Sequence, residues 1–179
     1  MARPKVLKPR FLNLELSYMD LFNRIPPYPD SISGTTVLVR LLDVLGFRFR
    51  WSTEGLSDDD YGFRPAPECM SIEELVRHVW GLVNWVGLSM GLDDFELGDD
   101  VARTRESVLE MIHVLRGGLN FMSDEELEEI TIREMLFWHI INGPLSDALT
   151  HVGQINSFRR LAGNPTPKAN VFTGKPLGD

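Results

Sequence analysis

A chain of 179 residues is long enough for one domain, and its net charge of −8 argues against nucleic-acid binding, which depends on cationic contacts with phosphates. Hydrophobic residues make up 43% of the chain, enough to form a core, and a single cysteine, Cys69, excludes an internal disulfide. No window approaches the roughly 18 uninterrupted apolar residues of a membrane-spanning helix, and no apolar run follows the N-terminal cations. We therefore expect a soluble, cytoplasmic protein that binds neither nucleic acid nor a membrane.

Residues 1–30 are predicted to form an irregular N-terminal arm that lies along the body of the protein. Prolines at high density disfavour regular helix, and this stretch contains Pro4, Pro9, Pro26, Pro27 and Pro29. The segment from Phe11 to Phe22 is nevertheless apolar enough to pack against the body, and it could form one short helix.

The first long helix is expected from Ser33 to about Ser52, because apolar residues recur there with the spacing of one helical face. Those residues are Val37, Leu38, Leu41, Leu42, Leu45 and Phe49. The acidic and proline-containing stretch 53–70 is expected to be a loop.

Three capping boxes predict where later helices begin. In this motif a serine or threonine, and a glutamate three residues later, each satisfy a backbone N–H group of the other. The pairs are Ser71 with Glu74, Ser123 with Glu126, and Thr131 with Glu134. They should start, in that order, a helix reaching about residue 90, a short acidic helix and the last long helical segment. An apolar stripe over residues 101–115 predicts a further helix between the first two.

Pro144 interrupts the last long segment. Its ring clashes with the carbonyl group four residues back, and it has no N–H group to donate. The helix should either kink there or stop near Asn142 and restart with Pro144 as its first residue. Gly163 is the expected residue after the helix end, with Pro165 just beyond it.

No segment shows convincing strand-like alternation. Four long amphipathic segments predict an all-α fold, a helical bundle over residues 31–165, followed by a polar C-terminal tail at 166–179.

Two imidazoles and one carboxylate are the candidate metal ligands. His78 lies on the apolar side of its predicted helix, and Asp147 and His151 are one helical turn apart on another. Such a set can hold a divalent ion and leave positions open for water or substrate. The alternatives are a hydrogen-bonded core histidine at His78 and a local ion pair between Asp147 and His151.

Other residues are weaker candidates. His139 is a reserve ligand, Gln154 either orients a ligand or bonds backbone, and His113 is expected at the surface. The chain has no glycine-rich phosphate loop, no nucleophile elbow and no cysteine pair for zinc.

The last helix resembles that of the DinB-like (YfiT-like) proteins, a DNA damage-inducible family. The family pattern H-x-x-x-H-x-G-Q corresponds here to Asp147-Ala-Leu-Thr-His151-Val-Gly153-Gln154, and the serine-capped helix with one inward histidine corresponds to SIEELVRH, ending at His78. The departure is Asp147, where the family usually has histidine. The stretch NGP-x-x-DA-x-x-H-x-GQ resembles a subgroup in which aspartate is the norm.

This resemblance implies an up-down-down-up four-helix bundle that holds a divalent ion, Zn²⁺, Ni²⁺, Mn²⁺ or Fe²⁺, on His78, Asp147 and His151. It also implies a metal-dependent enzyme that acts on a small molecule by hydrolysis or thiol transfer. The rival hypothesis is a non-catalytic, stress-related helical binding protein without bound metal.

We expect a homodimer, partly from the family habit and partly from the aromatic residues. Large rings usually mark interfaces when a single bundle cannot bury them all, and the candidates are Trp80, Trp85, Phe137 and Trp138. The alternative is that the N-terminal arm covers them within one chain, through Phe11, Leu14, Leu16 and Phe22.

Overall fold

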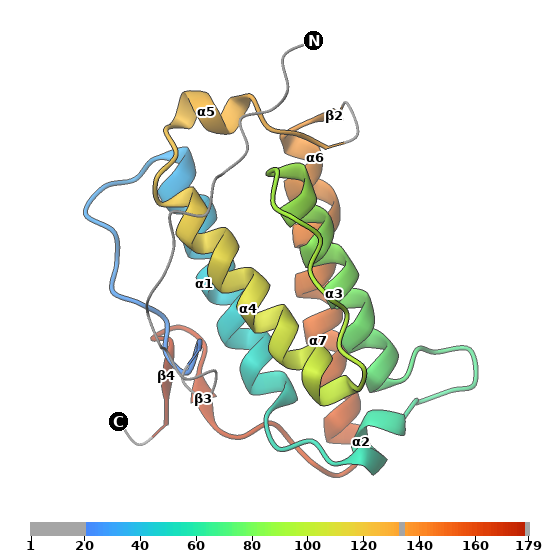
Figure 1. Ribbon diagram of the computed structural model, residues 1–179. Coiled ribbons are helices and arrows are strands. Elements are labelled where there is room, and N and C mark those ends of the chain that lie inside the picture. The colour runs from blue at the N-terminus through green and yellow to red at the C-terminus, as the bar shows by residue number, and fades with distance from the viewer. Residues whose placement is uncertain (1–20, 133–134, 178–179) are drawn as a thin grey trace.

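Four long helices carry the fold of this computed structural model, which describes residues 21–132 and 135–177. They are α1 (Gly34–Thr53), α3 (Ile72–Ser89), α4 (Val101–Leu119) and α7 (Ser146–Leu161). Helices α1 and α3 each pack against both α4 and α7 (Figure 1). The prediction of a mainly helical protein is confirmed. No described helix is both long and apolar enough to cross a membrane.

Side-chain contacts fix the directions of the long helices. Arg77 of α3 contacts Thr104 of α4, and three residues further along both helices Trp80 contacts Ser107. Helices α3 and α4 therefore run parallel. Their connection, residues 90–100, runs back along α3 (Figure 1). Helices α1 and α4 run antiparallel, because Asp43 pairs with Arg116 while Thr53 accepts a hydrogen bond from Arg105. Helix α7 runs alongside α1 in the same direction and opposite to α3 (Figure 1).

Serine side chains cap α1, α3 and two short helices at their N-termini, and Asp100 caps α4. The predicted capping boxes at Ser71 and Ser123 are confirmed, and they open α3 and α5 (Asp124–Glu128). A further box, Ser57 with Asp60, opens α2 (Asp58–Gly62) inside the stretch that was predicted to be a loop. That prediction was wrong there because the box uses aspartate at the third helical position, a weaker sequence signal than glutamate or glutamine.

Two short strand pairs correct the prediction of a structure without strands. Strand β1 (Thr131–Ile132) pairs antiparallel with β2 (Met135–Leu136), and β3 (Ala169–Asn170) pairs with β4 (Lys175–Pro176). Two-residue strands are too short to show alternation in a sequence. The helix start predicted at Thr131 is wrong, since Thr131 and Ile132 are β-branched and favour extended backbone. Its partner Glu134 lies outside the described residues.

The chain stays helical through Pro144. Helix α6 (Trp138–Ile140) passes into a wide π turn, η2 (Ile141–Leu145), and then into α7. The wide turn accommodates the proline, and the Ser146 hydroxyl donates to the Ile141 carbonyl at 2.6 Å. Of the two alternatives for Pro144, the helix therefore does not stop and restart there; it continues through a local distortion. Gly163 follows the helix end with φ of +89°, as predicted, and Asn164 donates its N–H to the Arg159 carbonyl.

One cluster of buried side chains from all four long helices forms the core. Its solvent-excluded members include Leu42 of α1, Val79 of α3, Ile112 of α4 and Ile155 of α7. Burying each such side chain stabilises the fold by about 1.5–3 kcal/mol. Trp80 and Trp85 pack on this cluster and are partly buried, and Trp80 donates to the Ser107 hydroxyl at 3.1 Å.

Phe22 anchors the described part of the N-terminal segment. It is buried in the core, with a positive φ of 57°, and its ring lies directly against Gly46 of α1. A Cβ atom at Gly46 would meet that ring at 2.6 Å, so this position needs glycine. The other predicted arm contacts, Phe11, Leu14 and Leu16, lie outside the described residues.

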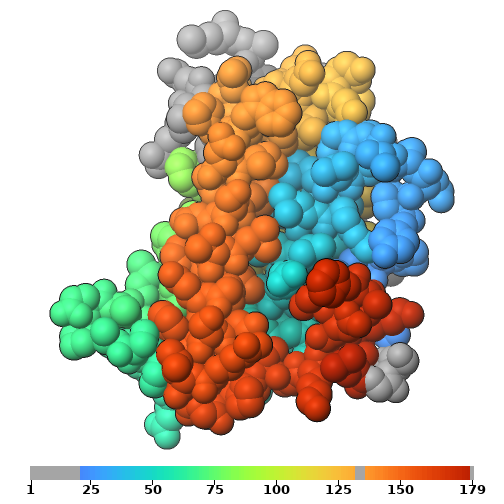
Figure 2. All heavy atoms as spheres, turned by 180° about the vertical axis from the view of Figure 1, so that it is seen from behind, coloured from blue at the N-terminus to red at the C-terminus, as the bar shows by residue number. Residues whose placement is uncertain are grey.

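Residues 166–177 fold back beside α1 and α7. The hairpin of β3 and β4 is tied to the N-terminal segment, where Ile25 donates its N–H to the Gly174 carbonyl at 2.9 Å. It is tied to α7 by a hydrogen bond from the Thr166 hydroxyl to Asn156 at 2.6 Å. From behind, α1 is visible between α7 and this C-terminal segment (Figure 2).

Candidate metal centre

The three predicted ligands come together between α3 and α7. Asp147 lies between the two imidazoles: its Oδ2 atom is 3.5 Å from Nε2 of His78, and its Oδ1 atom is 3.3 Å from Nε2 of His151. The two imidazole rings meet edge to face, with centroids 4.6 Å apart. The helical periodicity explains this arrangement, because residues four apart on α7 share one face and His78 faces them from α3.

Gln154 fixes the orientation of His151. Its side-chain oxygen is 2.7 Å from Nδ1 of His151, one turn further along α7. With the amide oxygen facing the ring, Nδ1 carries the proton and donates it, which leaves a lone pair on Nε2 in the neutral imidazole. That lone pair is directed toward Asp147, whose carboxylate is also an acceptor. Two acceptors 3.3 Å apart are stable only with a cation or a proton between them.

The spacing of the ligand atoms fits a small divalent ion. One ligand atom from each of the three residues lies within 4.8 Å of the other two. Ligands at about 2.1 Å from a tetrahedral ion are about 3.4 Å apart. The two contacts of Asp147 have a similar length, but they use different oxygens, Oδ2 toward His78 and Oδ1 toward His151. A closed structural site would need four protein ligands, and this cluster supplies three. Three ligands are the number that a site with an open coordination position uses.

The cluster is accessible from solvent on one side. The side chains of His78 and Asp147 are 38% and 46% exposed, whereas that of His151 is 15% exposed. A small molecule can therefore reach the carboxylate side of the cluster. His151 is the least exposed of the three side chains, and its ring contacts Gln154.

The remaining histidines do not join this cluster. His139 is exposed on α6, so the reserve ligand is not brought to the site. His113 lies on α4 and is partly buried rather than at the surface, and burial together with the nearby Arg116 charge lowers its pKa. Among the described residues, no other group of three or more potential ligands was found close enough to share an ion.

Arg159 is a buried residue that the sequence did not single out. It is completely inaccessible, and its guanidinium donates to the carbonyls of Ser52 at 2.9 Å and Asn164 at 2.7 Å. Asn164 in turn donates to Asp60 at 2.8 Å. Burial lowers the pKa of Arg159, against the opposing charge of Asp60. This network joins the ends of α1 and α7 and so fixes the helix that carries Asp147 and His151.

Comparison with known proteins gives no assignment: no protein-family model, no curated protein and no solved structure matches this chain.

Proposed function

We propose that this protein is a metal-dependent enzyme that acts on a small molecule, with His78, Asp147 and His151 holding a divalent ion. The observation that carries the proposal is the approach of two imidazoles to one carboxylate, with Nε2 of His151 3.3 Å and Nε2 of His78 3.5 Å from oxygens of Asp147. A divalent cation satisfies all three groups at once.

We further propose that the chain is a DinB-like four-helix bundle. The directions of the four long helices support this, since α1 and α7 run one way and α3 and α4 the other, in the up-down-down-up order. The position of the cluster between α3 and α7 also agrees with the resemblance of their sequences to that family.

The chain's own residues would prepare the site for hydrolysis or thiol transfer. A bound Zn²⁺, Ni²⁺, Mn²⁺ or Fe²⁺ would lower the pKa of a water molecule or a small-molecule thiol. Gln154 holds the His151 ring in the tautomer that presents Nε2. Asp147 offsets part of the positive charge, and its exposed edge leaves room for the substrate.

Metal binding is tested first on protein purified without a histidine tag. We expect one Zn²⁺, Ni²⁺ or Mn²⁺ per chain by elemental analysis after addition and dialysis, and a rise in melting temperature on adding the ion. His151→Ala should abolish both effects. His139→Ala is the matched control, because His139 is exposed and outside the cluster, and it should bind as the parent does.

A screen for activity follows on the loaded protein. Small-molecule thiols paired with electrophilic acceptors test thiol transfer, and ester and amide panels test hydrolysis. Turnover that depends on the added ion and is lost in His151→Ala would support the enzyme. Sub-stoichiometric metal with no thermal shift for any of the ions would contradict it.

The second candidate is a non-catalytic helical binding protein without metal. Its support is that Asp147 lies within ion-pair distance of both imidazoles, so a proton on either ring would also satisfy the carboxylate. In that case His78 and His151 act as a pair of polar side chains between α3 and α7, and metal addition leaves stability unchanged.

A further inference from the structure

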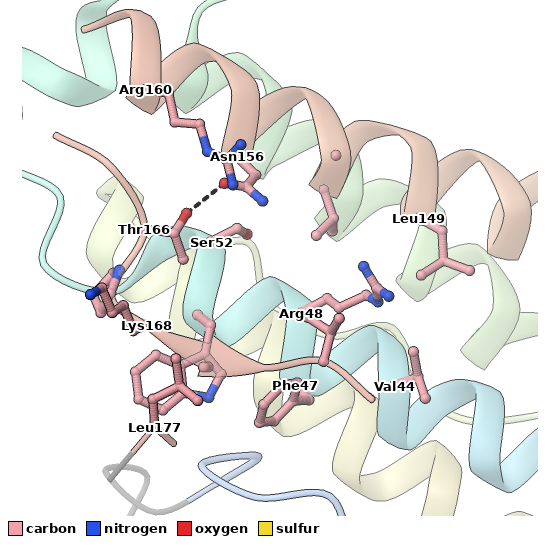
Figure 3. Close-up of a pocket in the computed structure, with 16 residues that line it drawn as sticks. Val44, Phe47, Arg48, Ser52, Leu149, Asn156, Arg160, Thr166, Lys168 and Leu177 are labelled. Carbon is pink, nitrogen blue, oxygen red and sulfur yellow. Dashed lines mark hydrogen bonds between the residues drawn. The ribbon is translucent and has the colours of Figure 1, made fainter. Parts of the chain in front are cut away.

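A pocket lies on the other side of α7 from the candidate metal ligands. Its volume is about 760 Å³, within the range of small-molecule sites, and it is enclosed by α1, α7 and the C-terminal segment 166–177 (Figure 3). At 100° per residue, the α7 residues that line it, such as Leu149 and Asn156, face away from Asp147 and His151. This pocket is therefore separate from the candidate metal centre.

Apolar and aromatic side chains form the inner surface of this pocket. Phe47 and Trp51 contribute from α1, and Leu149 and Val152 from α7. The Trp51 indole is held in place by a hydrogen bond from its N–H to the Asn23 carbonyl at 3.3 Å. A fixed aromatic wall of this kind favours an apolar or aromatic ligand body.

Three cations, Arg48, Arg160 and Lys168, line the same pocket, and no carboxylate lines its described part. In a chain with a net charge of −8, a pocket with this charge is unexpected. In Figure 3, Arg160 lies beside Asn156, Lys168 lies in the C-terminal segment just before β3, and Arg48 extends from α1 toward Leu149.

These cations have no partners among the described residues. Every other arginine in 21–132 and 135–177 has a hydrogen bond, an ion pair or a ring contact, whereas the side chains of Arg48 and Arg160 have none there. The Lys168 side chain likewise has no hydrogen bond or ion pair within that part of the chain. Cationic side chains grouped around an apolar cavity are suited to an anionic head group.

We propose that this pocket binds an organic anion with an apolar body, of the acyl or aryl carboxylate class. The carboxylate lies between Arg48, Arg160 and Lys168, and the apolar body lies against Val44, Trp51 and Leu149. The C-terminal segment closes one side, so the hydrogen bond between Thr166 and Asn156 helps to retain the ligand.

The test is calorimetric titration of the full chain with sodium octanoate, with 1-octanol as the uncharged comparison. We expect saturable one-to-one binding of octanoate, at least about tenfold tighter than that of octanol, because hydrogen bonds to charged groups are worth about one factor of ten each even when partly exposed. Binding should weaken as sodium chloride is raised.

Two double variants make the test specific. Arg48→Gln with Arg160→Gln should raise the octanoate Kd at least about tenfold, since both side chains are exposed and can be replaced without disturbing the core. Arg64→Gln with Arg103→Gln removes the same charge from exposed side chains outside the pocket and should leave the Kd unchanged.

Equal binding of octanoate to the two double variants would overturn the proposal, as would equal binding of octanoate and octanol or no binding at millimolar concentration. His151→Ala should leave octanoate binding unchanged, because the pocket does not include the metal ligands. Failure of the anion site and failure of the metal site are therefore distinguished by separate variants.

Discussion

Replacing Arg159 by methionine should strongly destabilise the protein, although the change keeps an unbranched apolar stem at this position. The guanidinium is fully buried and donates to the carbonyls of Trp51, Ser52 and Asn164, and to the Asn164 side chain. Methionine would leave these buried or partly buried oxygens without their donors. Their positions at the ends of α1 and α7 mean that both helix ends lose their hydrogen-bond partners at once.

The magnitude follows from the number and type of these hydrogen bonds. Hydrogen bonds from a charged donor contribute about 1.5 kcal/mol each, and relief from burying the guanidinium offsets part of the loss. A net loss of about 3 kcal/mol in the free energy of unfolding is the result. For a chain of this length, that corresponds to a fall in melting temperature of about 6–12 °C.

The neighbouring residue supplies the control. Arg160→Met removes the same charge from an exposed side chain that makes no hydrogen bond with the described residues, so it should change the free energy of unfolding by less than about 0.5 kcal/mol. Urea denaturation followed by circular dichroism measures both. If Arg159→Met and Arg160→Met lose similar stability, the guanidinium network does not hold α1 and α7 together.

Further predictions concern packing, the metal site and assembly. Gly46→Ala should destabilise the fold by about 1–3 kcal/mol because the new methyl group meets the Phe22 ring, whereas Gly117→Ala, with open space around it, should stabilise α4 by about 0.5–1 kcal/mol in the same denaturation assay. Gln154→Ala should weaken metal binding about 10–100-fold in competition titrations, because Gln154 contacts the His151 ring. Ser157→Ala is the control and should leave binding unchanged, because the Ser157 hydroxyl donates to the Gly153 carbonyl instead. We also expect a homodimer through the end that exposes Trp138, which is 68% accessible, so light scattering should give about twice 20.3 kDa for the parent and half of that for Trp138→Glu. A monomer mass for the parent would refute the dimer.

The sequence predicted the long helices well because their signals are local. The box of Ser71 and Glu74 and the apolar repeat that follows it need no tertiary partner to be recognised. The prediction of a helix beginning at Thr131 was wrong because the same box pattern competes with β-branched residues, and pairing with β2 decides the outcome. The sequence does not decide whether the helix continues through Pro144, because a π turn depends on neighbouring packing.

The candidate site was accessible from the sequence only in part. The one-turn spacing of Asp147 and His151 is a local feature, and it correctly places both near His78 once α3 and α7 pack. The contact of Gln154 with the His151 ring was one of two alternatives, and the structure shows this contact. The sequence could not predict that Arg159 is buried or that three cations line one pocket. Both facts depend on how α1, α7 and residues 166–177 meet.

The partly buried His113 leads to a prediction of pH dependence that does not involve the metal centre. Burial, followed by the nearby positive charge of Arg116, lowers the pKa of His113 below its ordinary value of 6.5. Between the lowered pKa and about 6.5 the unfolded chain therefore binds more protons at this residue than the folded chain, so the free energy of unfolding rises with pH. The contribution is fully present above about pH 6.5 and is lost as the pH falls through this window.

His113→Gln should remove this part of the dependence. Urea denaturation of parent and variant from pH 5 to pH 8 should give a parent-minus-variant difference that grows with pH and becomes constant above about pH 7. High salt should weaken the share due to Arg116 more than the share due to burial, since screening acts on the charge and not on desolvation. A difference that stays constant over the whole range would show that His113 titrates alike in the folded and unfolded chains, and the environment assigned to it on α4 would then be incorrect.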